Sequence, residues 1–498
     1  MSKEIIVLIA GRLAQALLSI AVLRAMTAFL SPLEAGRYFL FISLASGFSF
    51  FLINPVGMYI NRKLHSWQRG RTILDRFGVF NIYTLLSALA ALAFSMLWVT
   101  LTGSGLDIPL WLFGCGVAAY LYFNTWNMTL VPALNMLGHR VAFVTLTVLT
   151  MGLGLGLAVL AVTGLRPAAF YWVSGQTAAM AVIALIGLLL IKKNTGEVFS
   201  GTRRVLAALD RPSVQGVKAF ALPLAGATIF MWMQLQGYRL VVEARAGAEL
   251  LGYLAIGLGI AGSLGAVMES LVQQVYYPGF YRKVSSADPA ARAGAFSALT
   301  EKAFPAYIIL FFFTVSLAPQ LAALLVDAKF GGVVPFIIFG AFTEILRMAG
   351  NVLASAAHSE MRTRILIKPY AYGGAALLAG VYLAAGAPER ETLVPLAMIL
   401  GGLVTVVAMW GQVRRMVQVR INVRLLAKTA AASAPLLLFV LFRESAGFWI
   451  SFVFIGIAGL YFALLQYLAA FRWTVAVKPA AADGPPAADE NREAPVYE

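Results

Sequence analysis

Arginine and amide side chains recur at helical spacing inside stretches that are otherwise apolar. Arg12 and Gln15 lie three residues apart and share one helix face, and Arg24 follows about 18 Å further along the same axis. Gln236 and Arg239 show the same three-residue spacing. Arginine stays charged at any relevant pH, and its planar guanidinium donates two parallel hydrogen bonds to phosphate or carboxylate oxygens. The pattern therefore indicates binding of an anionic group in apolar surroundings.

Carboxylates occur in the same apolar stretches. Glu243 lies four residues after Arg239, Glu344 lies three residues before Arg347, and Glu269 stands in a long apolar run. Burial favours the neutral carboxyl, so such a residue can take up a proton and release it as its exposure changes. We predict ion coupling for the three glutamates, with Glu269 as the best candidate. The alternative is that each carboxylate only neutralises a neighbouring arginine.

The composition shows which elements must position these side chains. Sixty per cent of the 498 residues are hydrophobic, and only 12% are charged. A soluble domain of this length has too little interior to bury so much apolar surface, so the solvent must be lipid. Lipid-exposed backbone must form its hydrogen bonds within its own segment. We therefore expect an all-α, polytopic membrane protein.

A spanning helix needs about 20 mostly apolar residues to cross about 30 Å of hydrocarbon. About fourteen segments meet this requirement: 5–30, 37–60, 78–101, 109–133, 141–163, 168–191, 217–243, 249–276, 303–326, 333–356, 365–386, 392–412, 425–442 and 446–470.

Basic residues are distributed unequally between the two sides of these segments. The tails and the loops on one side hold 28 of the 38 lysines and arginines, the opposite loops hold six, and four lie within segments. Because basic loops remain in the cytoplasm, we expect both termini there. The net charge of +16 then reflects topology, and no nucleic-acid partner is expected.

An internal repeat divides the chain. Arg24, Glu34 and Tyr38 recur 215 residues later as Arg239, Glu249 and Tyr253. In each copy the glutamate opens the second helix of a pair, and we expect that helix to end at a proline–glycine element before a basic pair. Six segments separate the copies, so both enter from the same side and the repeat is parallel.

The repeat predicts the domain organisation. We expect two six-helix lobes at 1–192 and 217–412, joined by a linker at 193–216 that contains an interfacial amphipathic helix. Two additional transmembrane helices follow at 413–471. The tail at 472–498 should be disordered because it is rich in proline and charge.

The order of these features resembles the multidrug/oligosaccharidyl-lipid/polysaccharide (MOP) exporter superfamily, especially its bacterial oligosaccharide-lipid flippases (the Wzx-like branch). The resemblance covers residues 1–470. It rests on the run from Gly11 and Arg12 through Leu-Ser-Pro-Leu-Glu-Ala-Gly at 30–36, on Gly-Ala-Glu-Leu-Leu-Gly-Tyr at 247–253, and on Ala-Leu-Asn-Met-Leu-Gly-His-Arg at 133–140. It implies that helices one, two, seven and eight line a central cavity, to which the first helix supplies basic residues.

The resemblance and the polar spacing together predict a substrate site and a function. The predicted substrate-binding residues are Arg12, Gln15, Arg24, Gln236, Arg239 and Arg347. The expected activity is translocation of a polyprenyl-diphosphate-linked oligosaccharide across the bacterial inner membrane by alternating access, for cell-surface polysaccharide synthesis. Such a flippase is not an enzyme and needs no catalytic residue, metal or cofactor beyond a proton or another coupling ion. Its further partners would be membrane lipids and the polysaccharide synthesis machinery.

Three other functions compete with this one. A drug or metabolite cation antiporter of the same fold predicts acids in the first lobe, yet no Asp or Glu lies within the first six segments. A membrane glycosyltransferase or polysaccharide polymerase generally needs a large outer loop, whereas every outer loop here has about ten residues or fewer. A scaffold for a synthesis complex would not need the arginines.

Two further sequence signals carry no chemistry. The G-x-G-x-x-G match at 257–262 lies within an apolar segment with no preceding strand, so it does not indicate nucleotide binding. The three histidines and the single cysteine have no metal-ligand spacing.

Overall fold

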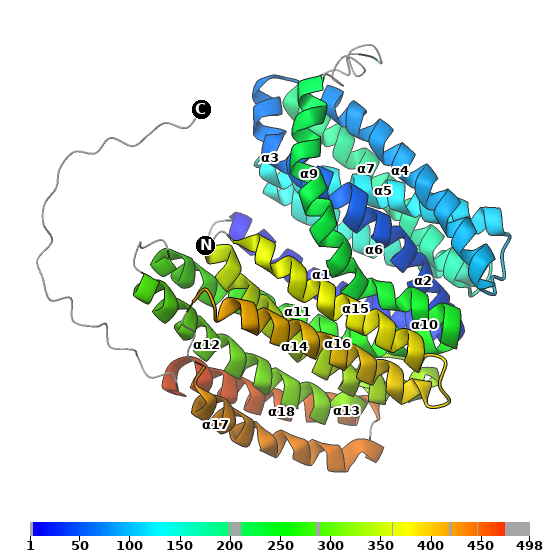
Figure 1. Ribbon diagram of the computed structural model, residues 1–498. Helices are drawn as coiled ribbons and strands as arrows, with labels where there is room; N and C mark the ends of the chain where they lie inside the picture. The colour runs from blue at the N-terminus through cyan, green and yellow to red at the C-terminus, as the bar shows by residue number, and fades with distance from the viewer. Residues whose placement is uncertain are drawn as a thin grey trace, which may run out of the picture.

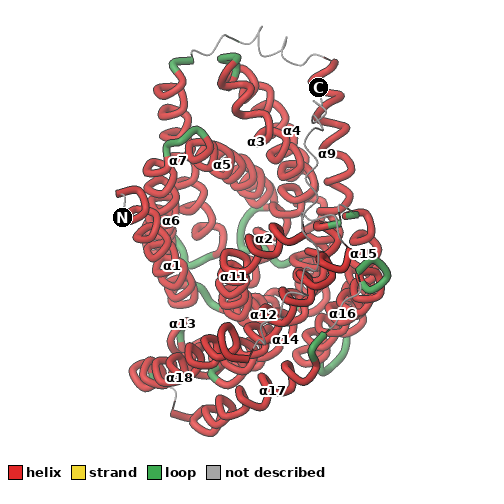
Figure 2. Tube along the Cα trace, turned by 90° about the vertical axis from the view of Figure 1, so that its left-hand side faces the viewer, coloured by secondary structure: helices red, strands yellow, loops and turns green. Residues whose placement is uncertain are grey.

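The computed structural model describes residues 3–197, 201, 211–284, 289–360, 362–417, 421–445 and 447–473, and these contain helices and no strand (Figure 2). Twelve helical stretches in this part of the chain are long and apolar enough to span a membrane. The predicted segments 109–133 and 365–386 form two further helices, α5 (Leu110–Met136) and α15 (Ile367–Ala384). The all-helical, polytopic fold predicted from the sequence is confirmed.

The helices form two bundles (Figure 1). The first bundle contains α1 (Lys3–Phe29), α2 (Pro32–Phe48), α3 (Asn54–Arg69), α4 (Ile73–Thr102), α5, α6 (Arg140–Gly164) and α7 (Ala169–Thr195). The second bundle contains α11 (Ala248–Val284), α12 (Pro289–Ser316), α13 (Ala318–Leu325), α14 (Val334–Ser359), α15 and α16 (Arg390–Val413). The exact lobe boundaries drawn from the repeat stay a prediction.

Two pairs of helices complete the molecule. The helix α9 (Arg211–Trp232) starts beside α3 in the first bundle and leads into α10 (Tyr238–Ala246), which packs on α11 and α15 (Figure 1). It therefore crosses from one bundle to the other. The helices α17 (Val423–Ser433) and α18 (Phe448–Leu468) pack against α12 and α13, along the outer face of the second bundle.

The outer surface of the bundles is apolar. Large hydrophobic side chains are mostly exposed there, including Leu101 at 75%, Leu441 at 77% and Leu460 at 76%. Full exposure of such side chains to water would be unfavourable, and contiguous apolar patches of this kind mark a membrane-facing surface. The structure thus supports lipid as the surrounding solvent.

The two bundles approach each other most closely where α2 and α11 begin. A Cβ added to Gly36 would lie 1.6 Å from the carbonyl oxygen of Ala248, and one added to Gly252 would lie 2.0 Å from the carbonyl oxygen of Pro32. Only glycine permits backbones to approach this closely. The contact is reciprocal, and it joins the two copies of the sequence repeat. We call it the reciprocal crossing.

An ionic cluster stabilises the first bundle at the same end. Arg37 bonds to Glu34 and to Asp107 in the loop after α4, and Glu34 accepts a hydrogen bond from the Ala169 backbone N–H over 2.6 Å. The hydrogen bond from Arg37 holds the pKa of the Asp107 carboxyl below its ordinary value. This pairing contributes fully to folding stability at pH values above the pKa that Asp107 has in the unfolded chain. The contribution is lost as the pH falls through the lower pKa that Asp107 has in the folded protein.

A π-helical turn at Ser49–Ile53 joins α2 to α3. Pro55 lies two residues after its end, and a proline ring displaces the carbonyl four residues earlier, which accounts for the wider turn. The carbonyls of Phe50 and Leu52 accept hydrogen bonds from Thr228 over 2.8 Å and from Tyr83 over 2.9 Å. Side chains of α9 and α4 thus donate hydrogen bonds to backbone carbonyls of the wide turn.

Some local predictions were wrong. The second helix of each repeat does not end at its proline–glycine element, because α3 continues to Arg69 and α11 continues through Pro278 to Val284. The predicted segment 303–326 is interrupted at Leu317, between α12 and α13. Half of the predicted linker at 193–216, which was to contain the amphipathic helix, and nearly all of the tail at 472–498 lie outside the described residues.

Substitution of Gly36 or Gly252 by alanine should separate the bundles at the reciprocal crossing. We expect each change to cost about 1–3 kcal/mol, as overpacking does, or to shift the protein to a conformer in which α2 and α11 are further apart. The melting temperature in detergent and the distance between spin labels on α2 and α11 measure the two effects. Gly259→Ala is the matched control, since nothing lies within 4 Å of a Cβ added there. Equal behaviour of all three variants would contradict the role of the crossing.

Candidate functional site

Arg347 on α14 lies between two carboxylates. Its Nε donates a hydrogen bond to Glu344 Oε2 over 2.9 Å, and its Nη1 donates to Glu269 Oε2 on α11 over 2.9 Å. Asn351, one turn further along α14, donates to the other Glu269 oxygen over 2.6 Å. The side chains of Arg347, Glu269 and Glu344 are 28%, 12% and 17% exposed. We call these four residues the acidic cluster.

The acidic cluster carries more acid than base. Two carboxylates share one guanidinium, so the cluster holds one excess negative charge when both acids are ionised. An isolated charge in a membrane interior is costly, and it is usually neutralised by a proton or a paired cation. This unbalanced charge distinguishes the cluster from a simple ion pair.

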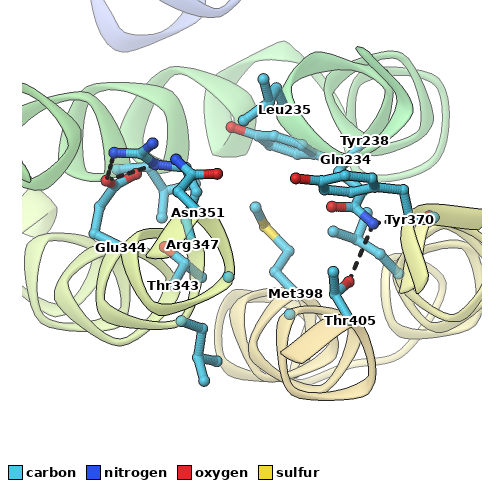
Figure 3. Close-up of a pocket in the computed structure, with 15 residues that line it drawn as sticks. Gln234, Leu235, Tyr238, Thr343, Glu344, Arg347, Asn351, Tyr370, Met398 and Thr405 are labelled. Carbon is cyan, nitrogen blue, oxygen red and sulfur yellow. Dashed lines mark hydrogen bonds and ion pairs between the residues drawn. The ribbon is translucent and has the colours of Figure 1, made fainter. Parts of the chain in front are cut away.

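A cavity of about 130 Å³ opens beside this cluster (Figure 3). Glu344, Arg347 and Asn351 line one side of it, and Met398 lies between them and the opposite side. On that side, Gln234 donates to the Tyr370 carbonyl over 2.8 Å and to Thr405 Oγ1 over 3.1 Å. The volume accommodates a few water molecules or a small ion but not a large headgroup.

A second polar group lies between the bundles. Gln236 Oε1 lies 3.3 Å from Ser46 Oγ and 3.5 Å from Ser43 Oγ on α2, and Trp232 Nε1 donates to Ser46 Oγ over 3.0 Å. We call Ser43, Ser46, Trp232 and Gln236 the inter-bundle seam. It connects α2 in the first bundle to the helix that crosses to the second.

A π-helical turn at Met233–Gly237 presents the two glutamines. Gln234 and Gln236 are two residues apart, so their side chains leave the helix in opposite directions. Gln234 bonds to α15 and α16 beside the cavity, and Gln236 bonds to α2 across the seam. One turn of helix thus connects the surroundings of the acidic cluster to the first bundle.

Arg239, on α10, lies next to the inter-bundle seam. It donates to Gln236 Oε1 over 3.1 Å and to the Tyr238 hydroxyl over 3.3 Å. Its guanidinium also lies 5.0 Å from the centre of the Phe39 ring, within cation–π range. Among the described residues it has no carboxylate partner. The alternative pairing with Glu243 does not form, because Glu243 instead accepts a hydrogen bond from Ser104 over 2.9 Å.

The polar residues of α1 are more open. Arg12 is exposed and lies 3.5 Å from Gln15 Oε1, and Arg24 lies 3.5 Å from the Ala323 carbonyl on α13 of the second bundle. Neither arginine pairs with a carboxylate in the part of the chain that the structure describes. Near the end of α1, Thr27 accepts from the Asp327 backbone N–H over 3.1 Å. This helix therefore packs on α6 and touches the second bundle along one side.

The structure groups the predicted site residues into separate sets. Glu269, Glu344 and Arg347 lie together, as do Gln236 with Arg239 and Arg12 with Gln15. Glu243 lies apart from the acidic cluster and binds the loop after α4. The pairing of Arg347 with Glu344, expected from their spacing, is present, and Glu269 joins it.

Six further residues that form hydrogen bonds in the site were not predicted from the sequence. They are Ser43, Ser46, Trp232, Gln234, Tyr370 and Thr405. Single serines and threonines in transmembrane helices usually bond to their own backbone, so their positions gave no signal. The pair Gln234 and Gln236 did give one, since two amides on opposite helix faces must both find partners in lipid.

Comparison with solved structures identifies the fold. No protein-family profile matches the sequence, and no curated protein sequence is similar to it. Among solved structures, the chain is similar to an inward-facing multidrug resistance MATE family transporter of the MOP superfamily, with 15% identity, a TM-score of 0.60, and 81% of this chain and 95% of that chain covered. It is also similar to the lipid II flippase MurJ in an inward closed conformation, with 12% identity, a TM-score of 0.66, and coverage of 93% and 98%.

The chain has the MATE and MurJ fold. This agrees with the architecture expected from the MOP resemblance, whereas the Wzx-like branch stays a prediction. In this MATE- and MurJ-type arrangement the acidic cluster lies inside the second bundle. Arg24 of α1 contacts α13 of the second bundle, and Arg239 of α10 contacts α2 of the first, so these two arginines lie between the bundles.

Removal of the Arg347 guanidinium should strongly destabilise the protein. Arg347→Ala leaves two carboxylates without their cation, and breaking a partly buried pair of this kind costs about 3–5 kcal/mol. We expect a lower melting temperature and less folded protein by size-exclusion chromatography. The variant with Arg347→Met, Glu344→Gln and Glu269→Gln should recover most of this loss, because it removes all three charges together. A triple variant as unstable as Arg347→Ala would show that charge balance is not the cause.

Proposed function

We propose that this protein is a membrane transporter that moves an amphiphile with an anionic headgroup between leaflets by alternating access. The substrate class that we propose is a polyprenyl-diphosphate-linked oligosaccharide, carried across the bacterial cytoplasmic membrane for cell-surface polysaccharide synthesis. In this proposal both termini lie in the cytoplasm. The sugar itself is not specified by the proposal.

The different surroundings of the four intramembrane arginines carry the proposal. Arg347 is neutralised twice, whereas Arg12, Arg24 and Arg239 have only amide, hydroxyl, carbonyl and ring partners among the described residues. Placing an arginine in a membrane costs about 2.5–3.5 kcal/mol on insertion scales. An anionic ligand that binds between the bundles supplies the missing counter-charge. A diphosphate suits this role because guanidinium groups bind phosphate oxygens through two parallel hydrogen bonds.

The arrangement also suits a lipid-linked substrate. Arg12 and Arg24 are about 18 Å apart along α1, so a headgroup can pass from one to the other across the membrane. The same helix exposes Leu13 at 60% and Leu17 at 65%, and these side chains can contact lipid. A polyprenyl tail can therefore stay in the bilayer while the diphosphate moves along the arginines.

The reciprocal crossing and the seam support alternating access. The backbones of the bundles meet at one end, apolar side chains of α2 and α11 pack against each other, and further along the bundles share a few hydrogen bonds around Gln236. In this proposal the bundles rotate as two bodies about that end, and the side chains of α2 and α11 repack as they do so. The likeness to an inward-facing and to an inward closed transporter supports the same kind of motion.

The acidic cluster is the proposed coupling site. Its one excess negative charge is neutralised when Glu269 or Glu344 takes up a proton or when the cavity takes up a monovalent cation. Gln234 lines that cavity, and Gln236, two residues later in the chain, is hydrogen-bonded to Ser46 of α2. A change of charge in the second bundle can thus alter the contact between the bundles. Glu243 is a secondary candidate because it bonds across to the first bundle through Ser104.

A cation antiporter of the same fold is the second candidate. The acidic cluster in the second bundle favours it, and so does the likeness to a MATE multidrug transporter. This function gives no role to the arginines without carboxylate partners. Transport of an organic cation and transport of an anionic lipid therefore distinguish the two.

Reconstituted liposomes test the proposed substrate class. The purified protein should transfer a fluorescent polyprenyl-diphosphate oligosaccharide between leaflets, and transfer should fall roughly tenfold or more in Arg12→Ala/Arg24→Ala and in Arg239→Ala. Each charged hydrogen bond contributes about 1.5–3 kcal/mol, which sets this scale. The control variant Arg166→Ala/Arg390→Ala removes two exposed arginines at the ends of helices, one before α7 and one at the start of α16. It should transfer the lipid-linked oligosaccharide at the normal rate. Unchanged transfer by Arg12→Ala/Arg24→Ala would show that these arginines do not bind the substrate. Exchange of organic cations without lipid transfer would identify an antiporter.

A pH gradient tests the acidic cluster. If Glu269 carries the coupling proton, Glu269→Gln should remove the effect of a pH gradient on transfer while leaving the Arg347–Glu344 pair in place. Glu249→Gln, which changes an exposed acid on the same helix, is the control. A sodium gradient in the same vesicles shows whether a metal cation replaces the proton. Normal gradient dependence in Glu269→Gln would place the coupling elsewhere.

A further inference from the structure

A groove of about 570 Å³ lies between α3, α4 and α9, away from the seam and the acidic cluster. Three basic residues, Lys63, Arg76 and Lys218, contribute to its lining, one from each helix. No acidic residue is among the fifteen that line it. Lys63 and Lys218 are exposed, and neither makes an ion pair or hydrogen bond within the described residues. The basic end of the groove is therefore suited to an anionic group.

The rest of the groove is apolar and aromatic. Tyr59 packs on Phe220 with ring centres 5.9 Å apart, and Phe80 stacks on Tyr83 at 6.4 Å. Along α4 the lining extends from Arg76 to Leu86. Ten residues of helix correspond to about 15 Å, which is half the hydrocarbon thickness of a bilayer. The groove thus offers charge at the loop end of the helices and an apolar surface as deep as one leaflet.

We propose that this groove binds an anionic phospholipid of the surrounding bilayer, with its phosphate at Lys63, Arg76 and Lys218 and an acyl chain along Tyr59, Val79 and Leu86. A small soluble anion would leave the apolar part empty, and a neutral lipid would leave Lys63 and Lys218 without a counter-charge. The volume lies in the ordinary range for ligand pockets. Basic residues at the cytoplasmic surface of membrane proteins attract acidic lipids in the same way. This proposal does not depend on the transported substrate.

The bound lipid would act on the helix that crosses between the bundles. Val214, Val217 and Lys218 are on α9, whereas the other lining residues are on α3 and α4. A lipid in the groove contacts all three helices and holds the first half of α9 against the first bundle. Because α9 leads directly into the turn that carries Gln234 and Gln236, occupancy of the groove favours the conformer seen here.

Native mass spectrometry of the full chain in detergent tests the proposal. We expect the protein to bind dioleoyl-phosphatidylglycerol at least tenfold more tightly than dioleoyl-phosphatidylcholine, which has the same chains and no net charge. Lys63→Ala/Lys218→Ala should abolish this preference. Arg62→Ala/Arg69→Ala removes the same charge from exposed positions of α3 outside the groove and should keep it. Equal binding of the two lipids by the natural protein, or equal loss in both double variants, would overturn the proposal.

Three further measurements identify the occupant. A photoactivatable phosphatidylglycerol should label peptides from residues 54–86, and Val79→Trp, which fills the apolar part, should reduce labelling at least fivefold without removing any charge. Glycerol phosphate should not compete, because it lacks the acyl chains. Competition by glycerol phosphate would instead identify a soluble-anion site. Preferential binding of an isoprenyl phosphate over phosphatidylglycerol would show that the groove is not a site for bilayer phospholipid.

Discussion

The close approach of the α2 and α11 backbones is the contact on which the rest of the arrangement depends. Gly36 faces the Ala248 carbonyl and Gly252 faces the Pro32 carbonyl, at distances that exclude any side chain. This contact fixes where the two bundles meet and hence which helix faces are opposite each other. The faces of α1 and α10 that carry Arg24 and Arg239 come to lie between the bundles as a result. In lipid, where water does not drive helices together, such close packing of small residues is a main source of association.

The crossing helix α9 is the second determinant. It belongs to the first bundle by its contacts with α3 and to the second by its continuation into α10. Its π-helical turn places two amides two residues apart, one toward each bundle. Wide turns of this kind are uncommon and often occur at functional sites. For the turn at Ser49–Ile53 the cause is Pro55, whereas no proline follows the turn at Met233–Gly237 closely enough to explain it.

The sequence predicted the membrane helices well and the site only in part. Each apolar segment is long enough to identify its helix, and the i, i+3 spacing was enough to pair Glu344 with Arg347. The addition of Glu269 to that pair depends on how α11 packs against α14, and the spacing along one helix contains no such information. Similarly, the spacing of Arg239 and Glu243 suggested a pair that the structure does not form, because Ser104 in a distant loop binds the carboxylate. Proline was a poor guide to helix ends, since neighbouring helices support α11 beyond Pro278.

The nature of the reciprocal crossing also has an energetic consequence. At Gly36 and Gly252 the glycine Cα groups face carbonyl oxygens, in contacts that are individually weak and do not respond to salt or pH. A rotation about such a contact breaks no strong bond there. The hydrogen bonds between the bundles, those around Gln236 and those of Thr27 and Glu243, then contribute to the free-energy difference between two conformers, at about 1 kcal/mol each. Because 1.4 kcal/mol corresponds to about a tenfold change in an equilibrium constant, the loss of one such hydrogen bond is sufficient to redistribute the population of conformers several-fold.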